Sequence, residues 1–118
     1  MSKNISKGKA GEDLAAEFLI KRGFNVIERN WRYSRYGEID IIAFDREILV
    51  FIEVKARTSN DYGHPIEAIN QNKVNKIRTI AGIYLNEKEG LKYKGVRFDA
   101  VCIILKNIPE ITYFKDIF

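Results

Sequence analysis

Cysteine, histidine and proline are scarce in this sequence, which holds one Cys, one His and two Pro in 118 residues. The single cysteine, Cys102, excludes an internal disulfide framework and any zinc site made of several cysteines. Because Cys102 lies in an apolar run, we expect a buried and inert thiol. The lone histidine, His64, cannot define a zinc site. Its place between Gly63 and Pro65 favours a structural or substrate-proximal role over a catalytic one.

Long apolar runs are also missing. No run approaches the ~20 residues that a membrane span needs, and the polar, lysine-bearing segment from Met1 to Gly11 lacks the apolar region of a secretory signal. We therefore expect a cytoplasmic protein without a membrane partner. The net charge of +4, from 20 Lys and Arg against 16 Asp and Glu, is mild. It is compatible with a polyanionic partner and does not establish one.

Apolar residues make up 46% of the chain and are spread along it without repeats, linkers or low-complexity tracts, so residues 1–118 are expected to form a single domain. The apolar spacing predicts the order α-β-β-β-α-β-β, with Gly23 ending the first helix. The predicted helices run from about Gly8 to Lys21 and from about Asn70 to Asn86, and the predicted strands are Phe24 to Glu28, Glu38 to Phe44, Ile48 to Ala56, Val96 to Leu105 and Ile111 to Phe118. Asn30 to Gly37 and Arg57 to Pro65 are expected to be loops. The predicted fold class is α/β, a mixed sheet with helices packed on it.

One acid lies on the core-facing side of the first predicted helix. At about 100° per residue, Glu12 falls inside the broad apolar arc that includes Ala15 and Leu19, whereas Asp13 and Glu17 lie on the opposite side. A buried carboxylate is costly unless it is paired, hydrogen-bonded or bound to a cation. Glu12 is then either a metal ligand or a structural acid. As a structural acid it would form an ion pair, or stabilise the helix N-terminus from the first turn.

Two predicted strands form an antiparallel hairpin that brings acids together. The expected apolar faces are Ile39, Ile41 and Ala43 on one strand and Ile48, Val50, Ile52 and Val54 on the other. Matching these faces around a tight turn predicts Asp40 opposite Glu53, and Glu38 opposite Lys55. Opposed carboxylates are destabilising unless they share a proton or a cation, and oxygen ligands favour Mg²⁺ or Mn²⁺ over zinc. The alternative is an accidental pair that Lys55 and nearby arginines neutralise.

Lys55 follows Glu53 by two residues and therefore shares its face of the strand. An ammonium beside a metal-bound carboxylate can orient or deprotonate an attacking water and can stabilise charge that builds on a phosphate. Glu12, Asp40, Glu53 and Lys55 are therefore the predicted catalytic residues, with the three acids as metal ligands. Without these acids, such a lysine would be an ordinary solvated strand residue.

The pattern D-x12-E-x-K formed by Asp40, Glu53 and Lys55 resembles the signature of the PD-(D/E)XK nuclease superfamily, whose restriction-endonuclease-like core has the order α-β-β-β-α-β. The stretches "GKAGEDLAAEFLIKRGF", "RNWRYSRYGEIDII", "LVFIEVKAR", "YGHPIEAI" and "RFDAV" closely resemble the YraN-like bacterial proteins, predicted endonucleases distantly similar to archaeal Holliday junction resolvases. This resemblance implies nuclease chemistry, with Glu12 in the place of a first-helix ligand. Glu38 and Ile39 precede Asp40, so the proline that gives the superfamily its name is missing. The aspartate is the ligand, so this departure is tolerable.

Further polar residues surround the expected site. Lys73 and Lys76 lie on the second helix beside its apolar stripe, where they could reach flanking phosphates, and Gln71 lies near the start of that helix. Arg32 and Arg35 belong to the basic and aromatic stretch before the metal-binding strand, and such stretches grip a backbone or stack on bases. We expect these five residues to bind nucleic acid. The alternatives are an ordinary solvated helix face and a packed tyrosine loop.

The leading hypothesis is a Mg²⁺- or Mn²⁺-dependent endonuclease that hydrolyses DNA phosphodiester bonds. Selectivity for branched or junction DNA would place it in recombination, repair or DNA uptake, and resolving a two-fold symmetric junction would imply a homodimer. A second hypothesis is a nucleic-acid-binding module with the same fold and little or no cleavage activity. A third is an interaction domain whose acids form ordinary ion pairs. The complete set of acids together with the lysine favours the first.

Overall fold

The computed structural model describes residues 7–59, 61 and 63–117. These residues form five strands and two α-helices in the predicted order, with one short 3-10 helix that the sequence did not predict. Along the chain the elements are α1 (Lys7–Lys21), β1 (Asn25–Tyr33), β2 (Gly37–Asp45), β3 (Ile48–Arg57), η2 (Pro65–Ala68), α2 (Gln71–Glu87), β4 (Gly95–Ile104) and β5 (Glu110–Phe114). None of the helices in this part of the chain is long and apolar enough to cross a membrane.

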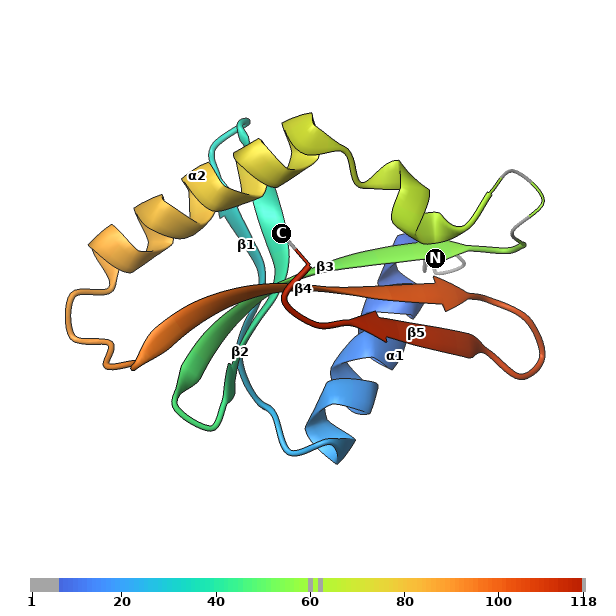
Figure 1. Cartoon of the computed structure of the whole chain (residues 1–118), viewed down its shortest axis with the longest axis horizontal. Helices are drawn as coiled ribbons and strands as arrows, with labels where there is room; N and C mark the ends of the chain where they lie inside the picture. Colours follow the sequence, from blue (N-terminus) through green and yellow to red (C-terminus); the bar gives the residue numbers. More distant parts are fainter. Residues whose placement is uncertain (1–6, 60, 62, 118) are drawn as a thin grey trace, which may run out of the picture.

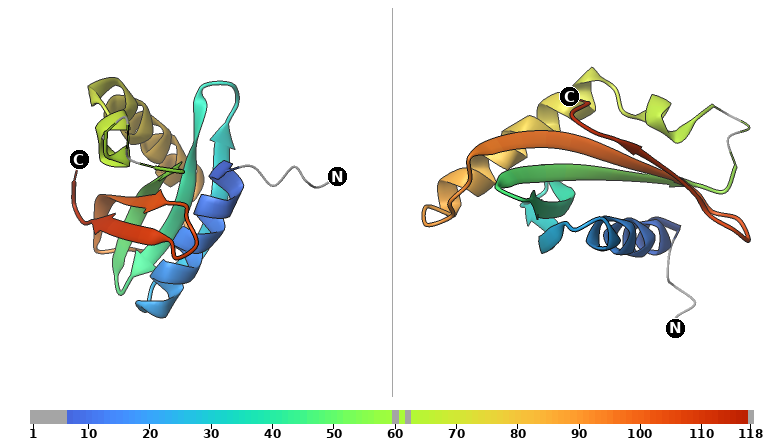
Figure 2. Two further views of the ribbon diagram at one scale, coloured as in Figure 1. Left: turned by 90° about the vertical axis from the view of Figure 1, so that its right-hand side faces the viewer. Right: turned by 60° about the horizontal axis from the view of Figure 1, so that its bottom comes forward.

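The strands form one mixed sheet in the order β1-β2-β3-β4-β5 (Figure 1). Neighbouring strands are antiparallel except for β3 and β4, which are parallel. A parallel pair requires a crossover connection, and the segment that carries η2 and α2 provides it. Figure 2 shows α1 and α2 on opposite faces of the sheet. The predicted α/β class, a mixed sheet flanked by helices, is therefore confirmed.

The buried side chains form two cores, one on each face of the sheet. Leu19 of α1 packs in one core with Ile41 of β2. Tyr84 of α2 packs in the other with Ile42, the next residue of β2. Adjacent residues of a strand point to opposite faces, so this part of β2 contributes to both cores and fixes the positions of both helices.

The first helix ends as its sequence predicts. Gly23 adopts a left-handed backbone conformation with φ of 97°. The Gly23 N–H donates to the Ile20 carbonyl at 2.9 Å, and the Phe24 N–H donates to the Leu19 carbonyl at 3.0 Å. This pair of hydrogen bonds satisfies the last carbonyls of α1 and turns the chain into β1.

Two predicted boundaries were wrong. β1 continues to Tyr33, so Asn30 to Tyr33 belongs to a strand rather than to a loop. This happens because β2 supplies backbone partners for the segment. In addition, Trp31 packs edge-on against Tyr84, with 5.1 Å between the ring centroids. β5 ends at Phe114 instead of continuing to Phe118. The chain turns there, and the Ile117 N–H donates to the Phe98 carbonyl at 2.9 Å. Phe118 itself lies outside the described residues.

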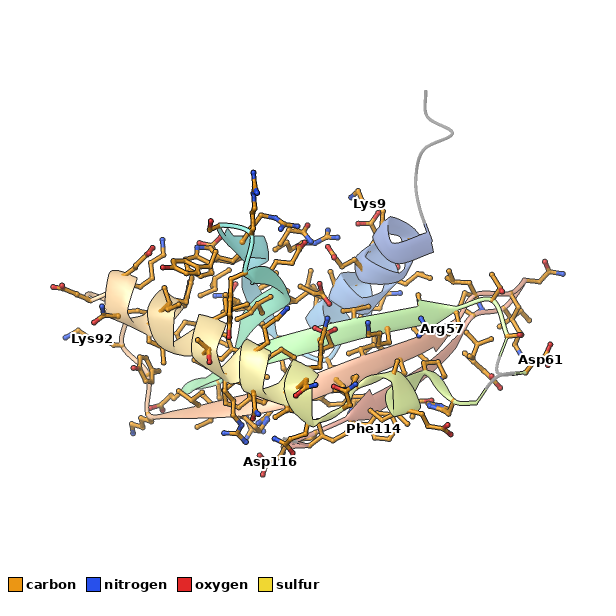
Figure 3. The ribbon with its side chains drawn as sticks, turned by 90° about the horizontal axis from the view of Figure 1, so that it is seen from above. Lys9, Arg57, Asp61, Lys92, Phe114 and Asp116 are labelled. Carbon is orange, nitrogen blue, oxygen red and sulfur yellow. The ribbon has the colours of Figure 1, made fainter. Side chains whose placement is uncertain are left out.

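His64 has a structural role at the start of η2, an element that the sequence did not predict. Its Nδ1 accepts from the Ile66 N–H at 3.1 Å, and its own N–H donates to Glu67 Oε2 at 3.3 Å. This reciprocal arrangement is a capping box. The ring also packs edge-on against Phe114. Asp61 precedes η2 in the sequence, and Lys92 follows α2. Figure 3 shows these two residues at opposite ends of the molecule.

Candidate active site

The β2–β3 hairpin has the predicted register up to the point where the acids lie. Backbone pairing runs from Asp45 with Ile48 to Ile41 with Ile52, which is the parity that would place Asp40 opposite Glu53. The pairing ends there. Asp40 Oδ2 accepts a 2.8 Å hydrogen bond from the Val54 N–H, so a side chain replaces the next backbone contact. The direct pairs Asp40–Glu53 and Glu38–Lys55 expected from the sequence are therefore not formed in the ladder.

The two strands diverge beyond this point. β3 continues alongside β4 as far as the pair Arg57 and Ile104. β2 continues with β1 into the hairpin turn at residues 34–36, and Figure 1 shows this hairpin separating from β3. Asp40 and Glu53 lie at the fork between the strands. A fork of this kind leaves space next to the acids that a continuous ladder would fill.

A cavity of about 290 Å³ occupies this fork. Asp40, Glu53 and Lys55, three of the four predicted catalytic residues, share its lining. The full lining consists of Arg32, Gly37, Glu38, Asp40, Glu53, Val54, Lys55, Lys73, Lys76 and Ile77. A second cavity of about 300 Å³, near the start of α2, shares Lys55, Lys73 and Lys76 with the first. The acids are thus bordered by a row of basic side chains.

The surroundings of Asp40 disfavour the ionised form of its carboxyl group. Burial, followed by the nearby Glu53 carboxylate, raises the pKa of Asp40 to about 8. The hydrogen bond from the Val54 N–H opposes this increase, and the charges of Glu12 and Glu38 add to it. A nearby positive charge would relieve this repulsion.

Glu53 is 4% exposed and faces two lysines. Its Oε2 lies 3.2 Å from Lys73 Nζ and 3.7 Å from Lys55 Nζ. Lys55 therefore has the predicted position next to the acid pair. Lys73 brings a second ammonium from α2. This contact with Glu53 was not foreseen from the sequence.

Glu12 is buried, as predicted, but it does not line the cavity. Its Oε1 lies 3.3 Å from Arg29 Nη2, and its Oε2 accepts a 2.8 Å hydrogen bond from Asn30 Nδ2. The structural alternative weighed for Glu12, an ion pair, is therefore present. Its charge nevertheless contributes to the raised pKa of Asp40.

Asn30 is the residue of this region that the sequence did not reveal. Its Nδ2 donates to Glu12 and also to Glu38 Oε1, at 3.1 Å. Its φ is 55°, a left-handed conformation in the middle of β1. Asparagine tolerates this conformation better than most residues and is depleted in strands. An asparagine among strand residues is the only sign of this conformation in the sequence.

The predicted alternation of faces also fails near Asn30. Arg29 contacts Glu12 of α1, whereas Trp31, two residues later, packs against Tyr84 of α2. On β2, Ile41 belongs to the core under α1, whereas Ile39 belongs to the core under α2. The prediction that Ile39 and Ile41 share a face was therefore wrong. The change of face falls at Asn30 in one strand and at Asp40 in its neighbour.

The predicted nucleic-acid contacts divide into two groups. Lys73, Lys76 and Arg32 line the cavity, with Arg32 Nη2 2.7 Å from Glu38 Oε2. Arg35 is exposed in the hairpin turn, and Gln71 is exposed with its Nε2 donating to Asn75 at 2.9 Å. Neither of these two side chains lines the fork cavity. The structure thus brings the first three, and not the last two, to the acids.

The donor set fits a divalent cation held by few protein ligands. Within residues 7–59, 61 and 63–117, no group of three or more His, Cys, Asp and Glu side chains could hold a metal ion. The predicted ligand set of Glu12, Asp40 and Glu53 is therefore not assembled. Mg²⁺ is commonly bound by one or two carboxylates, with waters and substrate phosphates completing its shell. Asp40 and Glu53 supply such a pair, and their mutual repulsion favours a cation.

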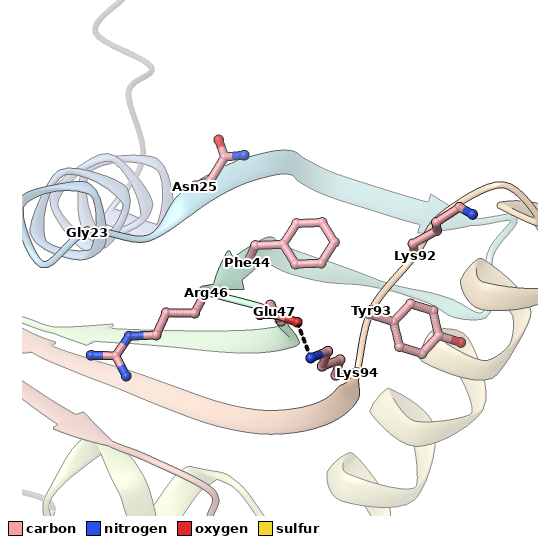
Figure 4. A pocket seen from close by; sticks show the side chains of 8 residues that line it. All are labelled: Gly23, Asn25, Phe44, Arg46, Glu47, Lys92, Tyr93 and Lys94. Atoms are coloured by element: carbon pink, nitrogen blue, oxygen red, sulfur yellow. Dashed lines mark ion pairs between the residues drawn. The ribbon is translucent and has the colours of Figure 1, made fainter.

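A larger cavity lies at the far end of β2 and does not contain these acids. It measures about 530 Å³ and is lined by Gly23, Asn25, Phe44, Arg46, Glu47, Lys92, Tyr93 and Lys94. Figure 4 shows its acid, Glu47, ion-paired with Lys94 at 3.0 Å, and Arg46 extending away from the Phe44 ring. This cavity lacks the paired carboxylates that define the fork, so the fork is the candidate active site.

Comparison with known proteins gives a family without an assigned activity. Residues 11–103 match the model of "Uncharacterised protein family UPF0102". A UPF0102 protein of Dictyoglomus turgidum is 49% identical over 108 residues, which cover 92% of this chain and 90% of that protein. Another, from Renibacterium salmoninarum, is 47% identical over 93% of this chain and 92% of its own length. A third, from Rhodococcus jostii, is 42% identical over the whole of both chains.

Proposed function

Since the chain belongs to the UPF0102 family, whose description assigns no activity, we propose from the candidate site that it is a divalent-metal-dependent endonuclease that hydrolyses phosphodiester bonds in DNA. The observation that carries this proposal is the fork cavity. It joins Asp40 and Glu53 with Lys55 and Lys73 in one space of about 290 Å³. Two carboxylates beside ammonium groups suit a reaction in which negative charge develops on a phosphate.

Asp40 and Glu53 are the residues that would hold Mg²⁺ or Mn²⁺ in this mechanism. When bound, such an ion supplies Lewis-acid stabilisation of the phosphate and lowers the pKa of a coordinated water. Lys55 Nζ lies 3.7 Å from Glu53 Oε2. In this mechanism it would orient the attacking water or balance the charge of the transition state. Glu12 and Glu38 add negative charge around Asp40 and favour the bound cation.

The basic side chains support a polyanionic substrate. Lys73, Lys76 and Arg32 line the cavity together with Lys55, so phosphates on either side of the scissile bond would meet positive charge. Contacts of this kind give affinity without sequence specificity. The resemblance to junction resolvases extends the proposal to DNA as the substrate. It also suggests a preference for branched or junction DNA in recombination, repair or DNA uptake. A two-fold symmetric junction would require a homodimer.

One observation favours a second function, a nucleic-acid-binding module without cleavage. Glu53 already has two ammonium groups within 3.7 Å, so its charge is neutralised by protein side chains and does not itself require a cation. In this alternative the lysines hold a phosphate, and Asp40 stays protonated near neutral pH. The two functions differ in whether metal and the Asp40 carboxylate are needed for a chemical step.

The test is cleavage of labelled branched, single-stranded and duplex DNA with Mg²⁺ or Mn²⁺, comparing the wild type with Asp40→Asn. Asp61→Asn is the matched control, because Asp61 is an exposed aspartate outside the cavity. We expect metal-dependent cutting by the wild type and the control, and a loss of at least about 100-fold in Asp40→Asn, as for removal of a key electrostatic group. If no DNA is cut although wild type and Asp40→Asn bind it equally, the binding module replaces the nuclease.

A further inference from the structure

The backbone of β1 is unusual at one position, Asn30. Arg29 pairs with Ile41 and Trp31 pairs with Ile39, so Asn30 lies at the position opposite Asp40. Its φ of 55° is left-handed, although the residues on both sides are in regular strand pairing. A conformation of this kind inside a strand persists only where the surrounding structure holds it in place.

The Asn30 side chain connects two acids from different elements. Its Nδ2 donates at 2.8 Å to Glu12 Oε2, on α1, and at 3.1 Å to Glu38 Oε1, on β2. An amide nitrogen has two hydrogens, so both carboxylates can be satisfied at once. Without this donor, two carboxylates that approach the same atom would repel each other.

Arginines complete the arrangement at both ends. Arg29 Nη2 lies 3.3 Å from Glu12 Oε1, and Arg32 Nη2 lies 2.7 Å from Glu38 Oε2. Each acid is thus fixed by an arginine on one oxygen and by Asn30 on the other. These contacts form a continuous chain from Arg29 to Arg32. Its member Glu38 shares the cavity lining with Asp40, and the charges of Glu12 and Glu38 both act on Asp40.

We propose that Asn30 is a positioning residue: its amide clamps Glu38 to Glu12 of α1 and thereby fixes Glu38 in the lining of the cavity where Asp40 and Glu53 would hold the divalent cation. The inference rests on the proposed metal-dependent function. The left-handed backbone is part of this role, because the strand changes faces at Asn30, with Arg29 directed to α1 and Trp31 to α2. The amide can therefore bridge an acid of α1 and an acid of β2.

The test compares Asn30→Gly with Ser34→Gly. Glycine accepts a positive φ without strain, so Asn30→Gly keeps the backbone and removes only the amide. Ser34, with φ of 50° in the turn of the same hairpin, is the matched control because none of the three acids contacts its side chain in the described structure. Mn²⁺ affinity is measured without DNA by isothermal titration calorimetry, and thermal unfolding is followed in parallel.

We expect Asn30→Gly to weaken Mn²⁺ binding by about 10–100-fold, as is typical when a partner that orients ligands is removed. Its melting temperature should fall, because the buried Glu12 carboxylate loses a hydrogen bond, and Mn²⁺ is titrated at a temperature at which the unfolding curve shows the variant to be folded. Ser34→Gly should bind Mn²⁺ like the wild type.

The possible failures are distinguishable. If Asn30→Gly binds Mn²⁺ as tightly as the wild type, or more tightly, the positioning role is overturned while the proposed metal centre stands. Equal weakening in Ser34→Gly would also overturn it, because glycine in the hairpin would then be the cause. If the wild type itself takes up no Mn²⁺, the positioning role and the proposed metal-dependent function both fail.

Discussion

At the scale of single residues, the surroundings of Asp40 disfavour the ionised form of its carboxyl group. Its carboxyl is held by the Val54 N–H, yet burial and Glu53 raise its pKa from the ordinary 3.8 to about 8. The folded chain therefore keeps a proton on Asp40 that the unfolded chain releases at lower pH. This difference in proton binding makes the free energy of unfolding depend on pH.

The sign of that dependence gives a prediction for Asp40→Asn. Because the folded-state pKa is the higher one, the wild type is not penalised at Asp40 below about pH 4 and loses stability as the pH rises from about 4 to 8. Asparagine can still accept from the Val54 N–H and carries no charge. In EDTA, we expect Asp40→Asn to melt several degrees above the wild type at pH 8–9, with the difference vanishing towards pH 4. Thermal unfolding across this range checks it.

The exposed Asp61→Asn should show no such trend. A difference between Asp40→Asn and the wild type that stays constant from pH 4 to 9 would contradict the raised pKa of Asp40.

The residues that line the candidate site were easier to predict from the sequence than Asn30, which joins Glu12 to Glu38. Asp40, Glu53 and Lys55 follow from strand alternation and a short turn, both of which are local properties. The contacts of Asn30 depend on the packing of α1 against the hairpin, and its left-handed φ depends on the fork. No local pattern contains this information. Glu12 illustrates the same limit: its burial was predictable, but its pairing with Arg29 was not.

At the scale of elements, the position of α1 on the sheet determines where Glu12 lies. Gly11, just before Glu12, packs so closely on β3 that an added Cβ would come within 2.6 Å of the Ala56 Cβ. Ala56 has no flexible side chain that could move away. The absence of a side chain at Gly11 thus allows α1 to lie directly on β3 and carries Glu12 into contact with Arg29.

We therefore predict that Gly11→Ala destabilises the protein, although alanine is the better helix former. The overlap with Ala56 must be relieved by moving α1, which typically costs about 1–3 kcal/mol and exceeds the gain of about 1 kcal/mol in helix propensity. Urea unfolding measures the difference. Gly82→Ala is the matched control, because a Cβ at this position of α2 meets nothing within 4 Å. It should stabilise the protein by about 0.5–1 kcal/mol, and similar effects of both substitutions would contradict the close packing.

The strand boundaries show why elements were predicted better than their lengths. Continuous apolar runs identified β2, β3 and β4, whose central residues are buried on both faces. β1 was cut short because Arg29, Asn30 and Arg32 interrupt the apolar pattern. These residues lie in the strand because their side chains find partners on α1 and β2. Polar strand residues whose partners are distant in sequence cannot be recognised from a local pattern.

At the scale of the whole molecule, the position of the charges matters more than their sum. The net charge of +4 identified no partner, but the fold gathers Lys55, Lys73 and Lys76 around the two adjoining cavities at the fork. Lys92 is also exposed, but it lines the cavity at the far end of β2 and neither cavity of the fork. If DNA binds at the fork, its affinity must respond to the lysines of the fork and not to lysines in general.

This expectation is tested by the salt dependence of DNA binding in EDTA, where cleavage is absent. Each phosphate neutralised by a lysine contributes about 0.9 to the slope of log affinity against log salt concentration for B-DNA. Lys76 is exposed and lines both cavities, so Lys76→Gln should lower the magnitude of that slope by about 1 and weaken binding similarly for all DNA sequences. Lys92→Gln should leave the slope unchanged. Equal losses in the two variants, measured by fluorescence anisotropy, would mean that DNA is attracted by overall charge and that the fork is not where it binds.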